Sequence, residues 1–197
     1  MRRRPATTAP LACGAPLVPI LILPLSHADP AEVERLLDAA FGTDRHQRTA
    51  YRLREGVAAI PALSFGAFDR GALVGSLQCW PVELVSDEAE PTPLVLLGPV
   101  AVWPERQQHG IGRTLMRAAL ASADATGADP LMLIGDPDYY ERLFGFHAAP
   151  TQRWDLPGPF ERRRLLVRAA PHHALPASGA VRSRGTVPVV QIGASVD

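Results

Sequence analysis

Residues 97–112 of this 197-residue chain read LGPVAVWPERQQHGIG. Residues 94–102, which overlap the start of this stretch, form a nearly continuous apolar run, as expected for a strand buried on both faces. Pro104 ends the run, and apolar residues then recur at helical spacing over 112–126. The pattern therefore predicts a buried strand, a turn that contains two glycines, and a helix.

The turn between this strand and this helix is suited to bind an anion. A helix N-terminus presents backbone N–H groups without partners and the positive end of the helix dipole. Gly110 and Gly112 lack a Cβ atom, so a phosphate can approach the backbone closely. For two glycines taken alone, chain reversal is a more common role than anion binding. The surrounding sequence is needed to distinguish these two roles.

Two familiar phosphate-binding motifs do not fit the turn. A Rossmann fingerprint needs a third glycine, and the chain has Leu115 at that position. Gly112-Arg113-Thr114 comes near the end of a P-loop, but the chain has Gln107 where that motif needs its upstream glycine. Neither motif therefore accounts for the turn.

The rest of the chain predicts one mixed α/β domain. Asp29 is expected to cap a helix that starts at Pro30 and ends at Gly42, and Arg70-Gly71 is expected to turn a hairpin. Further strands are expected over 18–25, 63–69, 72–81, 131–134 and 164–169, a short helix over 138–143, a polar helical or turn segment over 45–55, and loops over 86–93 and 154–159.

The ends of the chain lack an apolar face to bury. We expect residues 1–16 to form a disordered or extended tail, residues 17–173 to form the domain, and residues 174–197 to form a loose tail. The Arg-rich start is followed by a polar, proline-broken segment rather than the apolar core of a signal peptide, and the apolar run at 18–25 is much shorter than the ~20 residues of a membrane span. These features predict a cytoplasmic protein.

Charge and cysteine content exclude several classes of function. The chain has 20 Lys and Arg against 20 Asp and Glu, so no long-range field favours nucleic acid or an anionic membrane. Two cysteines imply neither a disulfide framework nor a structural zinc site. Cys79 lies in a strand pattern with no visible His or Asn partner, which favours a buried thiol over a nucleophile. We therefore expect no metal, no nucleic acid and no membrane partner.

The turn and several distant segments together resemble one enzyme superfamily. Gln107-x-x-Gly110-x-Gly112 after Val100-Ala101-Val102 resembles motif A of the GNAT N-acetyltransferases, and residues 133–146 resemble the strand, helix and Gly-Phe turn of motif B. Ala40-Phe41-Gly42, residues 49–55, Trp80-Pro81, residues 156–159 and residues 164–166 resemble the YhbS-like branch of predicted N-acetyltransferases. The likeness covers roughly residues 18–175.

The resemblance implies a central mixed sheet with helices on both faces and two splayed strands that hold acetyl-CoA. It implies that the backbone of the 100–102 segment orients the pantetheine and the acetyl carbonyl, while N–H groups from about Gln108 to Arg113 bind the pyrophosphate. The cofactor-binding residues that it implies are Val100, Ala101, Val102, Gln107, Gln108, His109, Gly110, Ile111, Gly112 and Arg113.

The implied reaction is direct transfer of an acetyl group to an amine in a ternary complex. A phenol suits protonation of the leaving sulfur, since its O–H donates. Tyr140 is our first choice for this acid and Tyr139 the alternative, because Leu143 adds one residue before Gly145 relative to the family pattern and leaves the register open. Candidate bases are Glu83, Glu55, Asp136 and His109, and a water relay is a further alternative.

The sequence thus predicts an acetyl-CoA-dependent N-acetyltransferase that acts on a small-molecule or peptide amine. A CoA-binding sensor or interaction module that keeps the fold without turnover is the alternative. Monomer and homodimer both stay open, and the acceptor cannot be read from the sequence.

Overall fold

A mixed eight-stranded sheet forms the centre of the protein in the computed structural model, which describes residues 19–86 and 90–185. The main path runs in the order β1-β2-β3-β4-β5-β7, while β8 pairs with β3 and β6 pairs with β8. The pairs β4–β5 and β6–β8 are parallel and the other pairs are antiparallel. The strands are β1 (Leu21–Pro24), β2 (Phe65–Asp69), β3 (Ala72–Val85), β4 (Thr92–Val102), β5 (Leu131–Ile134), β6 (Arg153–Asp155), β7 (Leu165–Arg168) and β8 (Ser178–Ser183).

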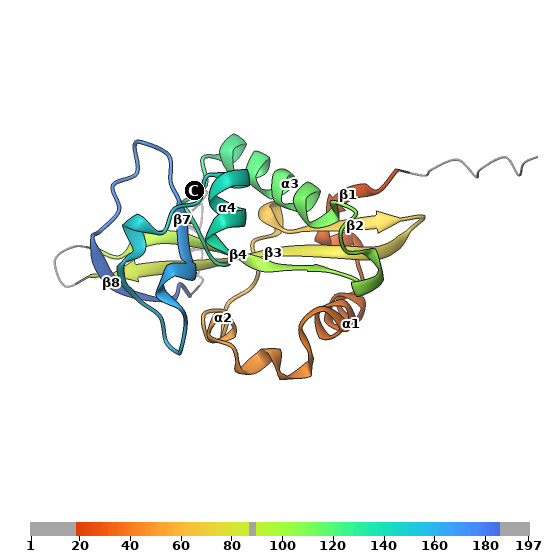
Figure 1. Ribbon diagram of the computed structural model, residues 1–197, viewed down its shortest axis with the longest axis horizontal. Helices are drawn as coiled ribbons and strands as arrows, with labels where there is room; N and C mark the ends of the chain where they lie inside the picture. The colour runs from red at the N-terminus through yellow and green to blue at the C-terminus, as the bar shows by residue number, and fades with distance from the viewer. Residues whose placement is uncertain (1–18, 87–89, 186–197) are drawn as a thin grey trace, which may run out of the picture.

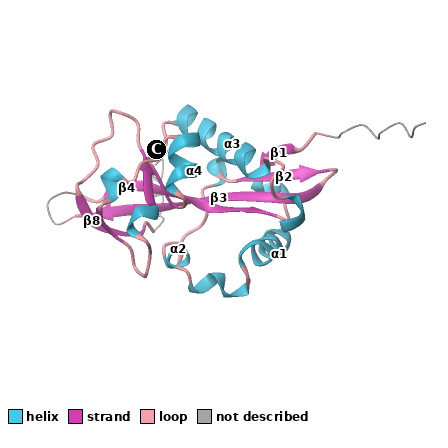
Figure 2. Cartoon of the chain, in the orientation of Figure 1, coloured by secondary structure: helices cyan, strands magenta, loops and turns pink. Residues whose placement is uncertain are grey.

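Helices cover both faces of the sheet, as Figures 1 and 2 show. On one face lie α3 (Ile111–Thr126) and α4 (Pro137–Phe144), and on the other lie α1 (Pro30–Phe41) and the short α2 (Thr49–Arg52). The expected α/β class, with a mixed sheet between two helical layers, is confirmed.

Local sequence signals account for the ends of α1 and α3. The Asp29 carboxylate accepts the N–H of Ala31 at 2.8 Å, which caps α1 at its predicted start, and Gly42 ends that helix with a φ of 83°. Gly127 ends α3 in the left-handed region, with a φ of 61°. Both helices bury an apolar stripe against β3 and β4, so their positions relative to the sheet are set by packing.

Two short strands occupy segments for which the sequence predicts no regular structure. Part of the expected loop at 154–159 belongs to β6, where Trp154 is fully buried, and part of the expected loose tail at 174–197 is β8, where Val181 is buried. β6 has only three residues, too few to show a period of two, and β8 (SGAVRS) carries one large apolar side chain, Val181. β8 pairs with β3, far away in the sequence. The expectation of a loose segment is therefore wrong for 178–183, and that of a loop is wrong for 154–155.

Other boundaries differ from expectation by a few residues. The predicted first strand shrinks to β1, β3 continues past Pro81 to Val85, and the segment at 45–55 divides into a 3₁₀ turn at Thr43–Gln47 followed by α2. The predicted tail at 1–16 lies outside the described residues, as do residues 186–197. Within residues 19–86 and 90–185, no helix is long and apolar enough to cross a membrane.

Candidate active site

The strands β4 and β5 separate part-way along their length. They pair in parallel only at Val95 with Leu131 and at Leu96 with Met132. Beyond these pairs, β4 continues to Val102 beside β3, while the end of β5 stays paired with β7. The result is the splay between these strands that the family resemblance implies, so that prediction is confirmed.

The backbone of β4 presents free polar groups to this gap. The Trp103 N–H donates to the Val74 carbonyl at 3.2 Å, so Trp103 faces β3. In an antiparallel pair, successive residues direct their N–H and C=O groups alternately toward the partner strand and away from it. Ala101 therefore also faces β3, whereas the backbone groups of Val100 and Val102 point away from β3 and toward the gap. The Gln107 side-chain amide already donates to the Val102 carbonyl, at 3.3 Å.

The turn before α3 leaves its N–H groups open. Gln108 and Gly110 have positive φ angles of 67° and 77°, and the first bond along the helix joins the Thr114 N–H to the Gly110 carbonyl at 3.0 Å. The N–H groups at the start of α3, including those of Ile111 and Gly112, have no carbonyl one turn earlier. A Cβ atom added at Gly110 would meet nothing within 4 Å, so the space over this helix end is open. The backbone N–H groups at this helix end are therefore open to a ligand, and the pyrophosphate site stays a prediction.

The side chains of the turn have different surroundings from its backbone. The Nδ1 atom of His109 lies 2.8 Å from the Gln107 carbonyl and 3.2 Å from the Arg106 carbonyl. Because carbonyls only accept, Nδ1 must carry the hydrogen, and the ring stabilises the turn. Ile111 is buried in the core beneath α3, so only its N–H can face a ligand, while Arg113 is exposed.

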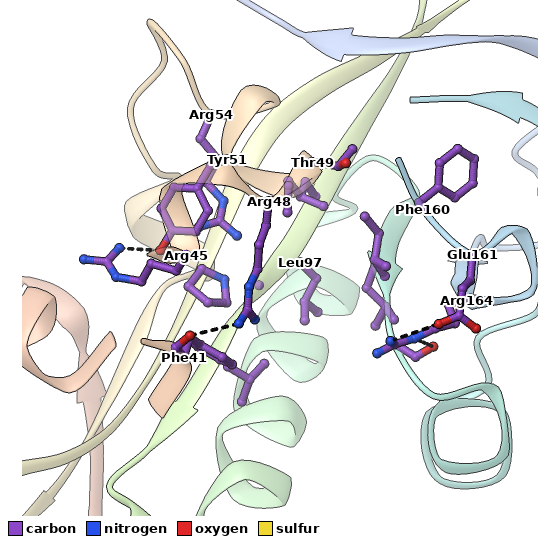
Figure 3. Close-up of a pocket in the computed structure, with 18 of the residues that line it drawn as sticks. Phe41, Arg45, Arg48, Thr49, Tyr51, Arg54, Leu97, Phe160, Glu161 and Arg164 are labelled. Atoms are coloured by element: carbon purple, nitrogen blue, oxygen red, sulfur yellow. Dashed lines mark hydrogen bonds and ion pairs between the residues drawn. The ribbon is translucent and has the colours of Figure 1, made fainter. Parts of the chain in front are cut away.

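A pocket of roughly 680 Å³ adjoins the gap (Figure 3). Its walls are the segment from α1 to α2, the separated ends of β4 and β5, the side chain of Tyr140 on α4, and the loop at 159–164. Because α1 and α2 cover the face opposite α3 (Figure 1), the pocket lined by the α1–α2 segment meets the gap from that opposite face. The resemblance includes residues 49–55, 156–159 and 164–166 but gives them no role, and Phe160 and Glu161 between the last two segments are not part of it.

Tyr140 lies at the point where the gap meets the pocket. Its ring packs directly on Gly135, where a Cβ atom would stand 2.3 Å from the ring carbon Cε2. It also contacts Tyr139, Phe144 and Phe146 edge-on or tilted. Burial, and then the neighbouring Tyr139, raises the pKa of the Tyr140 phenol to about 12, which keeps the O–H protonated near neutral pH.

The extra residue of α4 does not disturb the helix. Residues Pro137–Phe144 form a continuous α-helix, and Leu143 is one of the few large apolar side chains on the surface, 38% exposed. Tyr139 packs on Tyr140 and Phe144 but does not line the pocket. Of the two tyrosines left open by the sequence, the structure therefore brings only Tyr140 to the pocket wall.

The candidate bases end up in four different places. Asp136 lines the pocket and also caps α4, accepting the Asp138 N–H at 3.1 Å. Glu83 lies on β3, paired with Arg182 at 2.6 Å, and Glu55 lines a smaller cavity of roughly 230 Å³ beyond the pocket. His109 is at the turn and not among the pocket residues. Glu161, which sequence reasoning missed, is the second carboxylate of the pocket wall.

Cys79 is a fully buried thiol beneath the bulge of β4. Burial raises its pKa to about 12, so the thiol stays protonated, and the preference for a buried cysteine over a nucleophile agrees with this environment. In the described part of the chain, no group of three or more His, Cys, Asp and Glu side chains could hold a metal ion.

Arginines dominate the α1–α2 side of the pocket. Arg45, only 2% exposed, donates to the carboxylates of Glu34 and Asp38 and to the Tyr51 hydroxyl. Burial by itself would lower the pKa of Arg45, but these hydrogen bonds outweigh it and raise the pKa. The pocket is also lined by Arg48, Arg54 and Arg164.

Comparison with known proteins fits this geometry. Residues 22–149, more than half of the chain, match the family model described as an acetyltransferase (GNAT) domain. The chain belongs to the GNAT acetyltransferase family. The splayed strands and the open helix N-terminus are thus found in a chain whose family uses acetyl-CoA, and the resemblance read from motifs A and B is confirmed.

Relatives within the GNAT family cover most of the chain. The chain is 28% identical over 133 residues to the uncharacterized N-acetyltransferase YjhQ of Escherichia coli K12. The aligned residues cover 68% of this chain and 72% of YjhQ. The crystal structure of Escherichia coli YhbS in complex with CoA is similar with a TM-score of 0.62 and 25% identity, covering 87% of this chain and 93% of YhbS. A GNAT acetyltransferase from Brucella melitensis in complex with acetyl-CoA gives a TM-score of 0.57 and 27% identity, covering 84% and 96%.

Proposed function

We propose that this GNAT protein transfers the acetyl group of acetyl-CoA to a primary amine by direct attack in a ternary complex. The observation that carries the proposal is the meeting of three features: the gap between β4 and β5, the open N-terminus of α3 beside it, and a pocket that reaches the gap from the other face. Two similar GNAT structures hold CoA or acetyl-CoA, which supports the same ligand for this gap.

The cofactor site uses backbone more than side chains. We place the pyrophosphate on the N–H groups from Gln108 to Arg113, where the helix dipole adds to the attraction. The backbone groups of Val100 and Val102 face the gap and can hydrogen-bond the pantetheine arm. The side chains of Ala101 and Ile111 are buried, so these two residues shape the site through their backbone and packing.

The pocket supplies the second substrate. A neutral amine attacks the thioester carbon, the carbon–sulfur bond breaks, and one proton passes in balance from the amine nitrogen to the sulfur. Asp136 is the pocket carboxylate that we propose to assist removal of that proton, directly or through water, with Glu161 as the second carboxylate within the same wall.

Tyr140 acts at the leaving sulfur in this proposal. Its pKa of about 12 lies well above the roughly 8.5 of a free thiol, so complete proton transfer from the phenol to a thiolate is uphill. A protonated phenol can nevertheless donate a hydrogen bond to the sulfur as negative charge develops there. We therefore propose Tyr140 as a hydrogen-bond donor in the transition state, with the amine proton as the one that finally neutralises the sulfur.

Thiol release from acetyl-CoA with a panel of primary amines tests the proposed function. Amine-dependent release above the rate of hydrolysis supports a transferase. Binding of CoA, measured by calorimetry, without release by any amine would instead favour a CoA-binding sensor, and absence of CoA binding would contradict both functions.

A further inference from the structure

Two of the arginines that line the pocket have no acid to neutralise them. Arg48 donates to the Phe41 carbonyl at 2.8 Å and stacks on the Phe41 ring, with 5.6 Å from its guanidinium carbon to the ring centre. Arg54 stacks on the rings of Tyr51 and Trp80, at 4.4 Å and 5.5 Å. Neither has a carboxylate within ion-pair distance among residues 19–86 and 90–185.

The other two pocket arginines are paired. Arg45 is held by the carboxylates of Glu34 and Asp38, and Arg164 lies 3.7 Å from Glu161. Figure 3 shows Arg164 and Glu161 together on the side of the pocket opposite Arg48 and Arg54. The two guanidinium groups without a paired carboxylate thus lie on the α1–α2 side, while the carboxylates that line the pocket, Asp136 and Glu161, lie on the side of α4 and the loop before β7.

Arg54 is the more costly of the two to leave unpaired. Its Nε atom is buried and has no hydrogen-bond partner in the part of the chain that the structure describes. Burial, with the charge of Arg45 acting in the same direction, lowers the pKa of Arg54 to about 10 against the opposite influence of Tyr51 and Glu34, so the guanidinium still carries its charge at neutral pH. A partly buried guanidinium with an unpartnered N–H loses solvation free energy, which an arriving anion restores.

We propose that the acceptor amine carries an anionic group, a carboxylate or a phosphate, that Arg48 and Arg54 bind while the amine reaches the gap between β4 and β5. The inference rests on the proposed function and names the substrate class of the same pocket. The planar guanidinium matches the oxygens of both anions, and stacking on aromatic rings holds it in place. The same two charges disfavour polyamines and lysine-rich segments, which would bring further positive charge into the pocket.

Matched pairs of amines test the proposal. Glycine with glycinamide isolates a carboxylate, and phosphoethanolamine with ethanolamine isolates a phosphate. We expect the anionic member of at least one pair to have a kcat/KM at least tenfold above its neutral partner. The pair that shows the preference identifies which of the two anions the pocket takes.

The variant Arg48→Gln is the main test, because Arg48 is exposed and, among the described residues, its side chain makes one hydrogen bond, to the Phe41 carbonyl. Loss of a hydrogen bond to a charged group weakens binding by about 10- to 100-fold. We therefore expect the KM for the anionic amine to rise by this factor, with little change in kcat. Arg48→Lys should restore part of the binding. Arg35→Gln, which removes an exposed charge from α1 outside the pocket, is the control and should behave as wild type.

A binding experiment keeps the test independent of turnover. Inorganic phosphate and succinate are titrated into the protein with CoA in excess, at constant ionic strength, so that the turn before α3 is not the site observed. We expect one anion to bind in wild type and Arg35→Gln and to bind at least tenfold more weakly in Arg48→Gln.

The outcomes separate the two proposals. Turnover of neutral and anionic amines at equal rates, or a preference that Arg48→Gln retains, overturns the anionic acceptor and leaves the transferase intact. Absence of turnover with every amine counts against the transferase, and anion binding that depends on Arg48 then supports the anion site alone. Absence of both turnover and such binding overturns both.

Discussion

At the scale of single residues, the clearest gain from the structure concerns the two adjacent tyrosines. Sequence spacing could not choose between Tyr139 and Tyr140, because Leu143 lengthens the segment before Gly145. A continuous helix with Leu143 on its outer surface resolves this, since Tyr140 then lies on Gly135 at the pocket wall and Tyr139 packs behind it. The role of Tyr140 at the sulfur stays a proposal, and what is observed is its place on the pocket wall.

Removing the hydroxyl of Tyr140 tests its role. We expect Tyr140→Phe to lower kcat by about 100-fold, within the usual range for a group that donates to a leaving atom, with little change in CoA affinity. Since the pKa of Tyr140 is about 12, its deprotonation should not reduce the rate of the wild type below about pH 11. Steady-state kinetics and CoA calorimetry on the same samples measure both quantities.

The neighbouring tyrosine provides the matched control. Tyr139→Phe should keep most of the activity, because this side chain does not line the pocket. Loss of activity in Tyr139→Phe with none in Tyr140→Phe would reassign the donor, and full activity in both would remove tyrosine from the mechanism.

A glycine directly after β5 sets the position of the Tyr140 ring. A Cβ atom at Gly135 would lie 2.3 Å and 2.6 Å from two carbons of that ring, so Gly135→Ala must move the ring or the strand end. Displacement of a reacting group by about 1 Å can cost up to about 100-fold in rate. We expect Gly135→Ala to lower kcat at least tenfold.

A double-mutant cycle connects this effect to the tyrosine. In the background of Tyr140→Phe, Gly135→Ala should add little further loss, because the hydroxyl that it misplaces is already absent. Two fully additive losses would show that Gly135 acts by another route.

At the scale of elements, the cofactor site is the junction of β4 and α3. The two glycines of the turn have different reasons to be glycine. Gly110 has a φ of 77° with open space around its Cα atom, whereas Gly112 has an ordinary helical backbone, and a Cβ atom there would be 3.8 Å from side-chain methyls of Val100 and Val102. A side chain at position 112 is therefore compatible with the fold, which makes this position the cleaner test of ligand binding.

Charge placed at Gly112 should oppose CoA. An Asp in the first turn of a helix stabilises that helix by typically 0.3–1 kcal/mol, so Gly112→Asp should fold at least as well as wild type. The same carboxylate would repel a pyrophosphate on these N–H groups, and we expect the Kd for CoA to rise tenfold or more. Thermal unfolding and calorimetry report the two effects separately.

The variant Gly112→Ala distinguishes charge from bulk. It adds a methyl group at an ordinary contact distance and should weaken CoA binding less than Gly112→Asp does. Unchanged CoA affinity in a folded Gly112→Asp protein would place the pyrophosphate elsewhere.

At the scale of the whole molecule, β8 ties the C-terminal part of the described chain to the sheet. It pairs with β3 over Val82–Val85 and with β6, and Val181 packs in the core cluster that contains Leu84 and Trp154. The far end of the long β3 would otherwise present an unpaired edge and an exposed apolar face.

Truncation before and after β8 measures its contribution. A chain that ends at Pro176 lacks β8 and exposes the core residues that Val181 covers. Burial of an apolar side chain such as that of Val181 contributes about 1.5–3 kcal/mol. With the ladder to β3 also lost, we expect a fall on the order of 3 kcal/mol, which corresponds to roughly 6–12 °C in Tm for a chain of this size. Differential scanning calorimetry gives both values.

A chain that ends at Gly185 is the control, because it keeps β8. It should melt close to the full-length protein. Equal melting temperatures for the two truncated chains would show that β8 does not stabilise the fold.

The sequence by itself determined the features that depend on neighbouring residues. The Asp29 cap, the Gly42 and Gly127 helix ends, the two-glycine turn and the buried run of β4 are encoded within a few positions, because helix ends, turns and burial patterns are local properties. The fold class followed from the order of these elements together with the motifs that they carry.

Only the tertiary structure decided the features that join distant parts of the chain. The short β8 becomes a strand through pairing with β3, and Glu83 is paired with Arg182 on β8. Arg45 meets the carboxylates of Glu34 and Asp38, whereas Arg48 and Arg54 pair with none in the described part of the chain. Whether a strand edge is paired or a charge is neutralised depends on which groups lie close in space. The number of residues between two groups in the sequence does not give that distance.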